Sequence, residues 1–378
     1  YFQIVRCFRD EDLRADRQPE FTQLDMEMSF VDEEDIIDVV ERLMYHVFLE
    51  ALGVELSIPF PRMKHHEAIS KYGLDRPDLR YALELMDITS IAADVDFKVF
   101  SQVVRNGGVV KGINAKGCGD YSRKDIDDLT EYIKQFGAKG LAWMVVSNEG
   151  VKSPISKFFS ENEISLILDK MKGEVGDLLL FVADKSPVTA ESLGNLRRRL
   201  AEQMNLIPHD ELKFTWVTEF PLVNYNEEEG RWESEHHPFT SPSQKDLGIL
   251  EEKPGRVRAR AYDLILNGTE IGGGSIRIHN RRIQERVFSL IGLTKEEIED
   301  KFGFMLEAFE YGVPPHGGIA FGLDRLVMIM AGKESIRDCI AFPKTQSATC
   351  LMTEAPSSIS GDQLKELGIQ LKTRKRDS

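Results

Sequence analysis

The sequence predicts an α+β protein, an antiparallel sheet flanked by helices and interrupted by a second, compact α+β unit. Apolar and polar residues alternate in "QIVRCF" and "FTQLDMEMSF", a period that predicts two strands near the start of the chain. A strand–helix rhythm then runs through residues 87–205, and hairpin patterns return after it. These changes of pattern divide the chain into residues 1–86, 87–205 and 206–378.

The composition is typical of a globular protein with room for more than one domain. Of the 378 residues, 42% are hydrophobic and 29% are charged, which allows a sizeable core. The net charge of −15 argues against non-specific nucleic-acid binding, although a local basic groove stays open as an alternative. No run of residues reaches the roughly 18 apolar positions of a membrane span, so we expect no membrane association.

Four cysteines are scattered along the chain, and none belongs to a CxxC or CxxH pair. This spacing predicts neither a zinc site nor a disulfide framework. A reducing compartment, the cytoplasm, is the simplest interpretation.

The segment between the first two strands, "CFRDEDLRADRQPEF", carries three arginines among five acids. Arginine binds phosphates and carboxylates through two hydrogen bonds at once, so this loop could clamp a polyphosphate or an RNA end. A solvated loop whose charges neutralise each other is the alternative. After the second strand, we expect a helix that opens at Asp32, has apolar residues at three- and four-residue steps, and stops at Gly53.

Residues 87–205 alternate between strands and helices. We expect strands in "GGVVKGINA", "GLAWMVVS" and "DLLLFVAD", and each is followed by a helix. Two of the helices begin with capping boxes, Ser122 with Asp125 and Ser160 with Glu163. The third helix is "TAESLGNLRRRLAEQM".

The closing part predicts a hairpin with an acidic residue on each strand. The Asn-Gly dipeptide in "ARAYDLILNGTEIGGGSIRIHN" marks its turn and lets Asp263 approach Glu270. Two neighbouring carboxylates repel unless a cation lies between them, and oxygen ligands of this kind suit Mg²⁺ held together with substrate phosphates. A surface pair flanking the turn is the alternative.

Three glycines follow Glu270 in the return strand. Glycine weakens a strand, so this run indicates either the close approach of a ligand or backbone, or a bulge. Arg277 lies seven residues after Glu270, which puts it on the opposite face by strict alternation. A bulge among the glycines would bring both residues to one face.

Two further helices are expected, in "KEEIEDKFGFMLEAFEYG" and in the glycine-opened "GIAFGLDRLVMIMAG". Arg325 lies in the opening turn of the second, where the helix dipole repels a cation unless an anion neutralises it. Asp324 offers a local neutralisation as the alternative. The adjacent His236 and His237 in "HHPFTSP" do not by themselves indicate a ligand.

Together these segments resemble the class II aminoacyl-tRNA synthetases, and specifically the bacterial-type aspartyl-tRNA synthetases. The opening stretch is similar to motif 2 of that class, and "GGIAFGLDRLVMIMAG" is similar to motif 3. "KYGLDRPDLR", "HHPFTSP", "YDLILNGTEIGGGSIRIHN" and "RDCIAFPKTQSATCLMTEAPS" are similar to signatures of the aspartate enzymes. The resemblance covers essentially the whole chain. It implies a catalytic domain in two parts, residues 1–86 with motif 2 and residues 206–378 with motif 3 and a C-terminal extension, around the inserted α+β domain of residues 87–205.

For ATP, the resemblance implies a site made from motifs 2 and 3. Arg9 is expected on the α-phosphate and on the substrate carboxylate, and Phe21 is expected to stack on adenine. Glu11 is expected near adenine or the tRNA acceptor end, and Arg325 near adenine and the terminal phosphate. The remaining ATP-site residues that the resemblance implies are Asp10, Gln18, Glu270, Gly322, Leu323 and Asp324.

For aspartate and the metal, the resemblance implies a second set of residues. Asp25 is expected to meet the amino group of aspartate, and His236 to line the amino-acid pocket. Arg277 is expected to pair with the side-chain carboxylate of aspartate. Asp263 and Glu270 are expected to hold Mg²⁺. The residues implied to be catalytic are Arg9, Glu270, Arg277 and Arg325.

The implied reaction is the ligation of L-aspartate to tRNA in two steps. The α-carboxylate of aspartate attacks ATP to form aspartyl-adenylate and pyrophosphate, and the 3′ end of tRNA then takes the aspartyl group. Both steps depend on neutralised charge and aligned reactants. The resemblance also implies a cytoplasmic homodimer in the full-length protein, and it leaves open whether tRNA-Asn is charged as well as tRNA-Asp.

Relatives in this family begin with an anticodon-binding β-barrel and motif 1, and this chain starts at the first strand of motif 2. We therefore expect these 378 residues alone to be poorly active in aminoacylation. Aminoacylation at a full-length rate would contradict that expectation. Two rival interpretations are an asparaginyl-type ligase, which the insert and Arg277 oppose, and a non-catalytic synthetase-like RNA-binding paralogue, which the retained motif arginines and carboxylates oppose.

Overall fold

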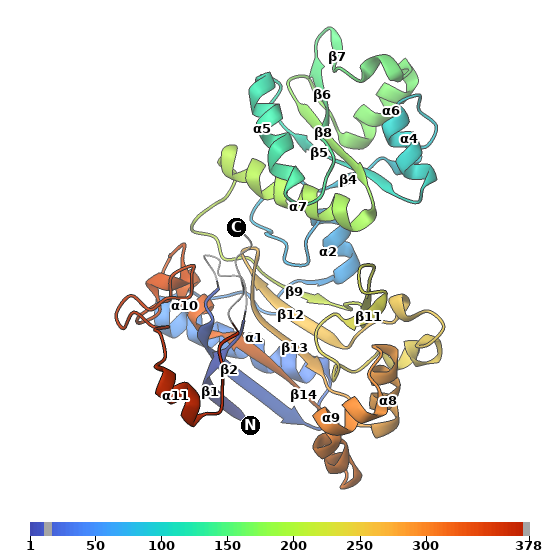
Figure 1. Ribbon diagram of the computed structural model, residues 1–378. Helices are drawn as coiled ribbons and strands as arrows, with labels where there is room; N and C mark the ends of the chain where they lie inside the picture. The colour runs from blue at the N-terminus through green and yellow to red at the C-terminus, as the bar shows by residue number, and fades with distance from the viewer. Residues whose placement is uncertain (11–16, 373–378) are drawn as a thin grey trace. The chain divides into compact units, whose positions relative to one another are not determined.

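The computed structural model describes residues 1–10 and 17–372. Within it the chain forms two compact units, the first made of Tyr1–Met26 and Ala320–Ser378 and the second made of Glu27–Ile319. Figure 1 traces both units from the blue N-terminus to the red C-terminal segment.

The first unit is built on the predicted hairpin. Strand β1 (Phe2–Phe8) pairs antiparallel with β2 (Glu20–Ser29), and the register runs from Phe2 opposite Met26 to Phe8 opposite Glu20. Strand β14 (His316–Gly322) leads from the second unit into helix α10 (Leu323–Met330), and the short helices η4 (Ile336–Asp338) and α11 (Gly361–Glu366) follow.

The predicted helix over "GIAFGLDRLVMIMAG" is wrong in its first part. Residues up to Gly322 form the end of β14, and only Leu323–Met330 are helical. Ile319 and Phe321 are fully buried while Ala320 between them is not, which is the two-residue period of a strand. Gly322 caps the helix, so the opening turn with Arg325 lies where the sequence predicted it.

The second unit contains a sheet in the order β14-β13-β12-β9-β3. Its centre is the predicted hairpin of β12 (Ala261–Leu266) and β13 (Thr269–Ile276), which turns at Asn267 and Gly268 with φ values of 52° and 77°. Strand β9 (Phe214–Thr218) is antiparallel to β12, and β3 (Arg62–Lys64) is parallel to β9. Positive φ at both turn positions is the reason for Asn-Gly there.

Helix α1 (Glu33–Leu52) packs on this sheet through an apolar stripe. It begins after Asp32 and ends at Gly53 in the left-handed region, as the sequence predicted. A capping box between Asp32 and Asp35, which was not predicted, closes its first turn. Phe48 lies edge-on to Phe214 at 5.4 Å between ring centroids. The remaining elements around this sheet are α2 (His65–Tyr72), β10 (Val223–Asn226), β11 (Arg231–Ser234), η2 (Gln244–Ile249), η3 (Pro254–Arg256), α8 (Arg281–Leu290) and α9 (Lys295–Glu310).

A separate five-stranded sheet also belongs to the second unit, in the order β4-β5-β8-β6-β7. Its strands are β4 (Met86–Asp87), β5 (Val109–Ala115), β6 (Ala142–Ser147), β7 (Gly150–Lys152) and β8 (Leu178–Asp184). Figure 1 shows α5 (Arg123–Lys134) and α7 (Ser186–Gln203) on one side of it and α4 (Lys98–Arg105) and α6 (Glu161–Met171) on the other. The short elements α3 (Thr89–Ala92), α4, β4, β7 and η1 (Ser156–Phe158) were not predicted.

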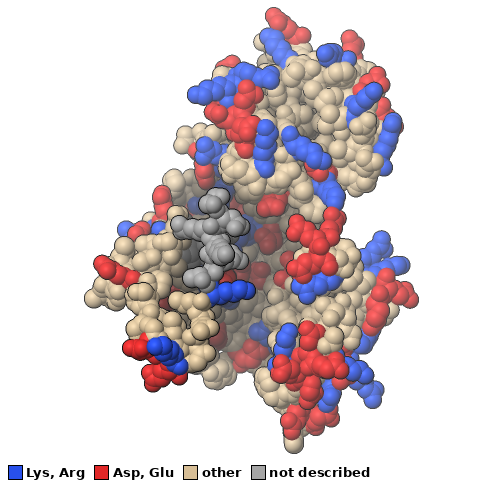
Figure 2. All heavy atoms as spheres, in the orientation of Figure 1, with Lys and Arg blue, Asp and Glu red and all other residues tan. Residues whose placement is uncertain are grey.

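The predicted α+β class is confirmed, with antiparallel sheets flanked by helices. No described helix is long and apolar enough to cross a membrane. Negative charge gathers locally, and Figure 2 shows red side chains over α9. Helix α9 contributes Glu296, Glu297, Glu299, Asp300, Glu307 and Glu310.

Candidate active site

Asp263 on β12 and Glu270 on β13 direct their carboxylates to the same place in the second unit. A Cβ atom built on Gly273 would lie 2.7 Å from Asp263 Oδ1 and 3.1 Å from Glu270 Oε1. The absence of a side chain at Gly273 therefore leaves open the space that the two carboxylates share. The prediction that they approach each other across the hairpin is confirmed.

A bulge puts Glu270 on this face of the hairpin. Leu264 pairs with Gly272 and Ile265 with Glu270, so Ile271 is the extra residue. Asp263 pairs with Gly273, and Ser275 and Arg277 follow on the same face at two-residue steps. The bulge that the sequence required to reconcile Glu270 with Arg277 is present, just before the glycines.

The glycine run also accommodates a neighbouring backbone. A Cβ atom on Gly274 would lie 2.2 Å from the carbonyl oxygen of Gly318 and 2.9 Å from Ile319 Cα. The space that the two carboxylates share at Gly273 and a close backbone at Gly274 are thus adjacent along one strand. The two alternatives that the sequence offered for these glycines, a bulge and a close approach, both hold.

Asp263 is held in a setting that disfavours its negative charge. Burial raises the pKa of Asp263 above its ordinary value, the nearby His236 opposes this, and the charge of Glu270 adds to the rise. Its Oδ1 atom is buried, lies 3.5 Å from His236 Nε2, and accepts no well-formed hydrogen bond. Burial alone would lower the pKa of His236, but Asp263 and Glu235 raise it above its ordinary value.

These carboxylates fit a hard divalent cation. Within the described ranges, no three His, Cys, Asp or Glu side chains form a metal-binding group. Mg²⁺, however, is usually bound by only one or two carboxylates together with substrate phosphates. A buried carboxylate oxygen without a hydrogen bond, beside a second carboxylate, is the donor set that such an ion satisfies.

Arg277 is clamped from several sides. Its Nε and Nη2 atoms donate to the two carboxylate oxygens of Glu27 at 3.1 and 3.2 Å. Its Nη1 atom donates to Ser275 Oγ at 2.7 Å and lies 2.8 Å from His237 Nε2. The Arg277 side chain is 21% exposed, so a rigidly oriented guanidinium reaches the surface of the hairpin.

His237 stays neutral beside this guanidinium. Burial and the charge of Arg277 lower the pKa of His237 to about 4. A neutral ring lets Nε2 accept the hydrogen bond from Arg277. No role was predicted for Glu27, Ser275 or His237. The alternation of β13 could have indicated Ser275, and the pair of adjacent histidines could have indicated His237. The other histidine of that pair, His236, lies near Asp263.

In the first unit, the structure brings Arg9 to Phe21. The Arg9 Cζ atom lies 5.2 Å from the centre of the Phe21 ring, and its backbone N–H donates to Pro19 at 2.9 Å. Gln18 is buried, and its amide bridges the backbone of Lys344, accepting from N at 2.8 Å and donating to O at 3.3 Å. Gln18 thus links the hairpin to the segment after motif 3.

The first turn of α10 is tied to β2 as well. The backbone N–H of Thr22 donates to Asp324 Oδ2 at 2.6 Å, so the Asp324 carboxylate anchors the turn that carries Arg325. Asp25 Oδ1 is buried and accepts no hydrogen bond from any described residue, which leaves an acceptor open. Asp10 is exposed, and Glu11 lies outside the described residues.

The sequence-predicted residues therefore form two groups, one in each unit. In the first unit Arg9 and Phe21 are in contact, and Gln18, Asp25, Gly322, Leu323, Asp324 and Arg325 lie on the hairpin strands, the loop between them, or the start of α10. In the second unit the hairpin face and the loop before it carry His236, Asp263, Glu270 and Arg277.

Comparisons with known proteins add a family. Residues 1–346 match the model of the tRNA synthetases class II (D, K and N). Three relatives carry the name aspartate–tRNA(Asp/Asn) ligase. The protein of Heliobacterium modesticaldum is 59% identical, and the match covers 98% of this chain and 61% of the relative. The protein of Moorella thermoacetica is 58% identical over 99% of this chain and 62% of the relative, and that of Bacillus cytotoxicus is 56% identical over 99% of this chain and 64% of the relative. The chain thus spans about three fifths of the length of these relatives.

Proposed function

Because this chain belongs to the class II tRNA synthetases (D, K and N), we propose that it is the catalytic part of an aspartate–tRNA ligase. In the proposed reaction L-aspartate attacks ATP to give aspartyl-adenylate and pyrophosphate, and the aspartyl group then passes to the 3′ end of tRNA with release of AMP. The names of its relatives, aspartate–tRNA(Asp/Asn) ligase, support both tRNA-Asp and tRNA-Asn as acceptors. We further propose a cytoplasmic homodimer for the full-length protein, with ATP and L-aspartate as its small substrates.

The observation that carries the proposal is the shared face of the β12–β13 hairpin. Asp263 and Glu270 meet over Gly273, and Arg277 follows on the same face. Asp263 and Glu270 would hold Mg²⁺, which when bound supplies positive charge to the phosphates of ATP. His236 positions the Asp263 carboxylate and lines the amino-acid pocket.

Arg277 is the proposed determinant of amino-acid specificity. Its guanidinium is fixed by Glu27 and Ser275, so it presents an oriented positive charge to the side-chain carboxylate of aspartate. Asparagine offers a neutral amide whose NH₂ group cannot accept a hydrogen bond, and the site rejects it on that ground. The open Asp25 acceptor is proposed to meet the amino group of aspartate.

For ATP, we propose the residues of the first unit. Arg9 neutralises the α-phosphate where the carboxylate attacks, and Phe21 stacks on adenine. Asp10, Glu11 and Gln18 contribute from the motif 2 strands and loop. Gly322, Leu323, Asp324 and Arg325 contribute from motif 3, where the anchored first turn of α10 supports Arg325 near the terminal phosphate.

We also propose that residues 87–205 are an inserted domain between two parts of a catalytic domain, residues 1–86 and 206–378. Two apolar clusters support this, because all their members lie between Leu83 and Met204, and all but Leu83, Leu85 and Met86 lie within residues 87–205. Each cluster covers one face of the β4-β5-β8-β6-β7 sheet, so this segment has a core of its own.

The metal part of the proposal is tested by titrating Mg²⁺ in Asp263→Asn and Glu270→Gln. Both variants are expected to need at least about tenfold more Mg²⁺ for ATP–pyrophosphate exchange with aspartate. The stabilisation of the protein by ATP and Mg²⁺ in a thermal melt should fall in parallel, a readout that needs no turnover. Glu251→Gln, which removes an exposed carboxylate paired with Arg286, is the control. Unchanged Mg²⁺ dependence in both variants would contradict the assignment.

A further inference from the structure

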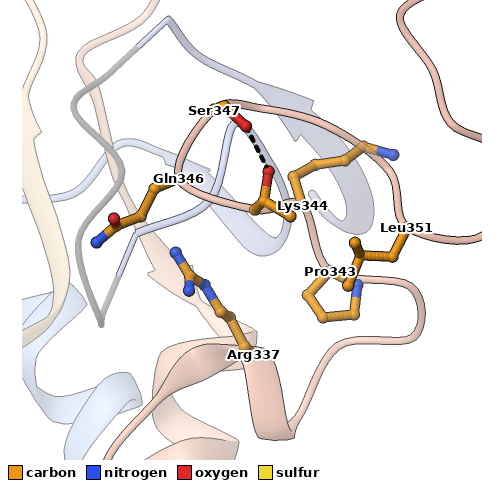
Figure 3. A pocket seen from close by; sticks show the side chains of 7 residues that line it. Arg337, Pro343, Lys344, Gln346, Ser347 and Leu351 are labelled. Atoms are coloured by element: carbon orange, nitrogen blue, oxygen red, sulfur yellow. Dashed lines mark hydrogen bonds between the residues drawn. The ribbon is translucent and has the colours of Figure 1, made fainter.

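A cavity lies in the first unit, after motif 3. It has a volume of about 510 Å³ and is lined by Arg337, Pro343, Lys344, Thr345, Gln346, Ser347 and Leu351. Figure 3 shows the Arg337 guanidinium directed at the turn that carries Gln346 and Ser347, while the Lys344 ammonium points away. The segment belongs to "RDCIAFPKTQSATC", to which the proposed reaction assigns no residue.

Arg337 contributes to the cavity a buried hydrogen-bond donor that has no acceptor among the described residues. Its Nε atom is buried and has no hydrogen-bond partner, and no carboxylate among the described residues pairs with its guanidinium. A buried donor left without an acceptor costs free energy, and a cation held away from carboxylates costs more. Native structures keep few such groups, and an ordered water, an ion or a ligand can satisfy them.

The opposite wall offers hydroxyl donors. Thr345 Oγ1 and Ser347 Oγ are 2.9 Å apart, and Ser347 Oγ and Thr349 Oγ1 are 3.3 Å apart. The backbone N–H of Thr349 already donates to Thr345 Oγ1 at 3.1 Å. When the chain of hydroxyls donates from Thr349 through Ser347 to Thr345, the last O–H is left to donate to a ligand.

The turn is fixed to the hairpin that carries the proposed ATP residues. Gln18 bonds both the N–H and the carbonyl of Lys344, directly before Thr345. The cavity is therefore held next to residues proposed to act on ATP. Among the described residues that line it there is no aromatic ring, so they offer a nucleobase no stacking partner.

We propose that this cavity binds a phosphate group of an RNA strand, with Arg337 as the cation and Thr345 as a hydroxyl donor. Contacts to backbone phosphates need a guanidinium and hydroxyls and no base platform, which matches this lining. That the RNA is a tRNA, bound near its 3′ end, rests on the proposed function. That the cavity binds a phosphate rests only on its lining residues. A phosphate of ATP would make the same contacts, and the experiment below distinguishes ATP from RNA.

The test is the binding of a labelled tRNA-Asp transcript, followed by fluorescence anisotropy at several salt concentrations. Arg337→Ala is expected to weaken binding about tenfold and to lower the slope of log K against log salt by about one. Arg337→Gln, which keeps a polar side chain over the turn, should show the same change in slope. Arg42→Ala is the matched control, because Arg42 is an exposed arginine paired with Asp38.

Unchanged affinity and slope in both Arg337 variants would overturn the proposal. A larger KM for ATP in pyrophosphate exchange, with unchanged RNA affinity, would assign the cavity to the nucleotide and also overturn it. If the wild-type protein does not exchange pyrophosphate with aspartate, but Arg337→Ala still lowers the salt slope, the phosphate site stands and the proposed function fails. The two failures are thus distinguishable.

Discussion

The carboxylates of Asp263 and Glu270 converge over Gly273. A Cβ atom at Gly273 would lie 2.7 Å from the Asp263 oxygen and 3.1 Å from the Glu270 oxygen. Repulsion between two such carboxylates is tolerated where a cation is to be bound. The relationship depends on one bulge residue, Ile271, because without it Glu270 would face the other side of β13.

Gly273→Ala should abolish most of the activity while leaving the fold intact. The new methyl group would push both carboxylates apart, and a displacement near 1 Å costs about a hundredfold in rate. We expect pyrophosphate exchange to fall about a hundredfold, with a free energy of unfolding within about 1 kcal/mol of wild type. Exchange kinetics and urea unfolding measure the two effects. Exchange at the wild-type rate would contradict the placement of the metal.

Gly274→Ala is the matched change, one residue further along the strand. Its Cβ atom would lie 2.2 Å from the Gly318 carbonyl oxygen, so strands β13 and β14 would have to separate. Overpacking of this kind costs about 2–3 kcal/mol, which urea unfolding would detect. Equal stability losses at Gly273 and Gly274 would show that the glycines serve packing alone.

Arg277→Lys should impair aspartate recognition selectively. Lysine keeps the charge but loses the fork that Glu27, Ser275 and His237 hold in place. We expect the KM for aspartate to rise at least about tenfold, with a smaller change in the KM for ATP. Arg258→Lys is the control, since Arg258 is similarly clamped by Asp246 and Glu219.

The partner variant Glu27→Gln should have a milder effect. The amide keeps one oxygen that can accept from Arg277, and it removes a charge that competes with the substrate carboxylate. We expect the KM for aspartate to change by less than about threefold. A loss as large as that of Arg277→Lys would contradict the view that the charge of Arg277 is what recognises aspartate.

Asp177 makes the stability of the β4-β5-β8-β6-β7 sheet dependent on pH. Its buried carboxylate accepts from the backbone of Gly117 and Glu174 and from the Asn114 side chain at 2.9–3.0 Å. Burial alone would raise the pKa of Asp177, but these hydrogen bonds hold it below its ordinary value. Because the pKa is lower in the folded than in the unfolded state, the stabilisation is present above the unfolded value of 3.8 and is lost as pH falls through the folded value.

Asp177→Asn should therefore cost about 2–3 kcal/mol at neutral pH, since the amide presents an NH₂ group to backbone donors. Below about pH 4 the difference from wild type should shrink. Urea unfolding at several pH values measures both. Asp127→Asn, which removes an exposed ion pair with Arg123, should change stability by no more than about 0.5 kcal/mol. A pH-independent difference for Asp177→Asn would contradict the linkage.

Much of the fold could be predicted because its signals are local. The Asn267-Gly268 turn, the helix start at Asp32 and the period of β1 and β2 each depend on a few neighbouring residues. Strand β14 was missed because its apolar residues are followed directly by those of α10. The two-residue period of the strand and the 3.6-residue period of the helix could not be told apart within one apolar run. The contact of Glu27 with Arg277 could not be predicted from the sequence, because 250 positions separate the two residues.

The central claim is tested most directly by ATP–pyrophosphate exchange with L-aspartate and with L-asparagine. We predict Mg²⁺-dependent exchange with aspartate, and a kcat/KM for asparagine lower by at least about a hundredfold, because Arg277 requires a carboxylate. Equal exchange with both amino acids, or exchange with asparagine alone, would contradict the account.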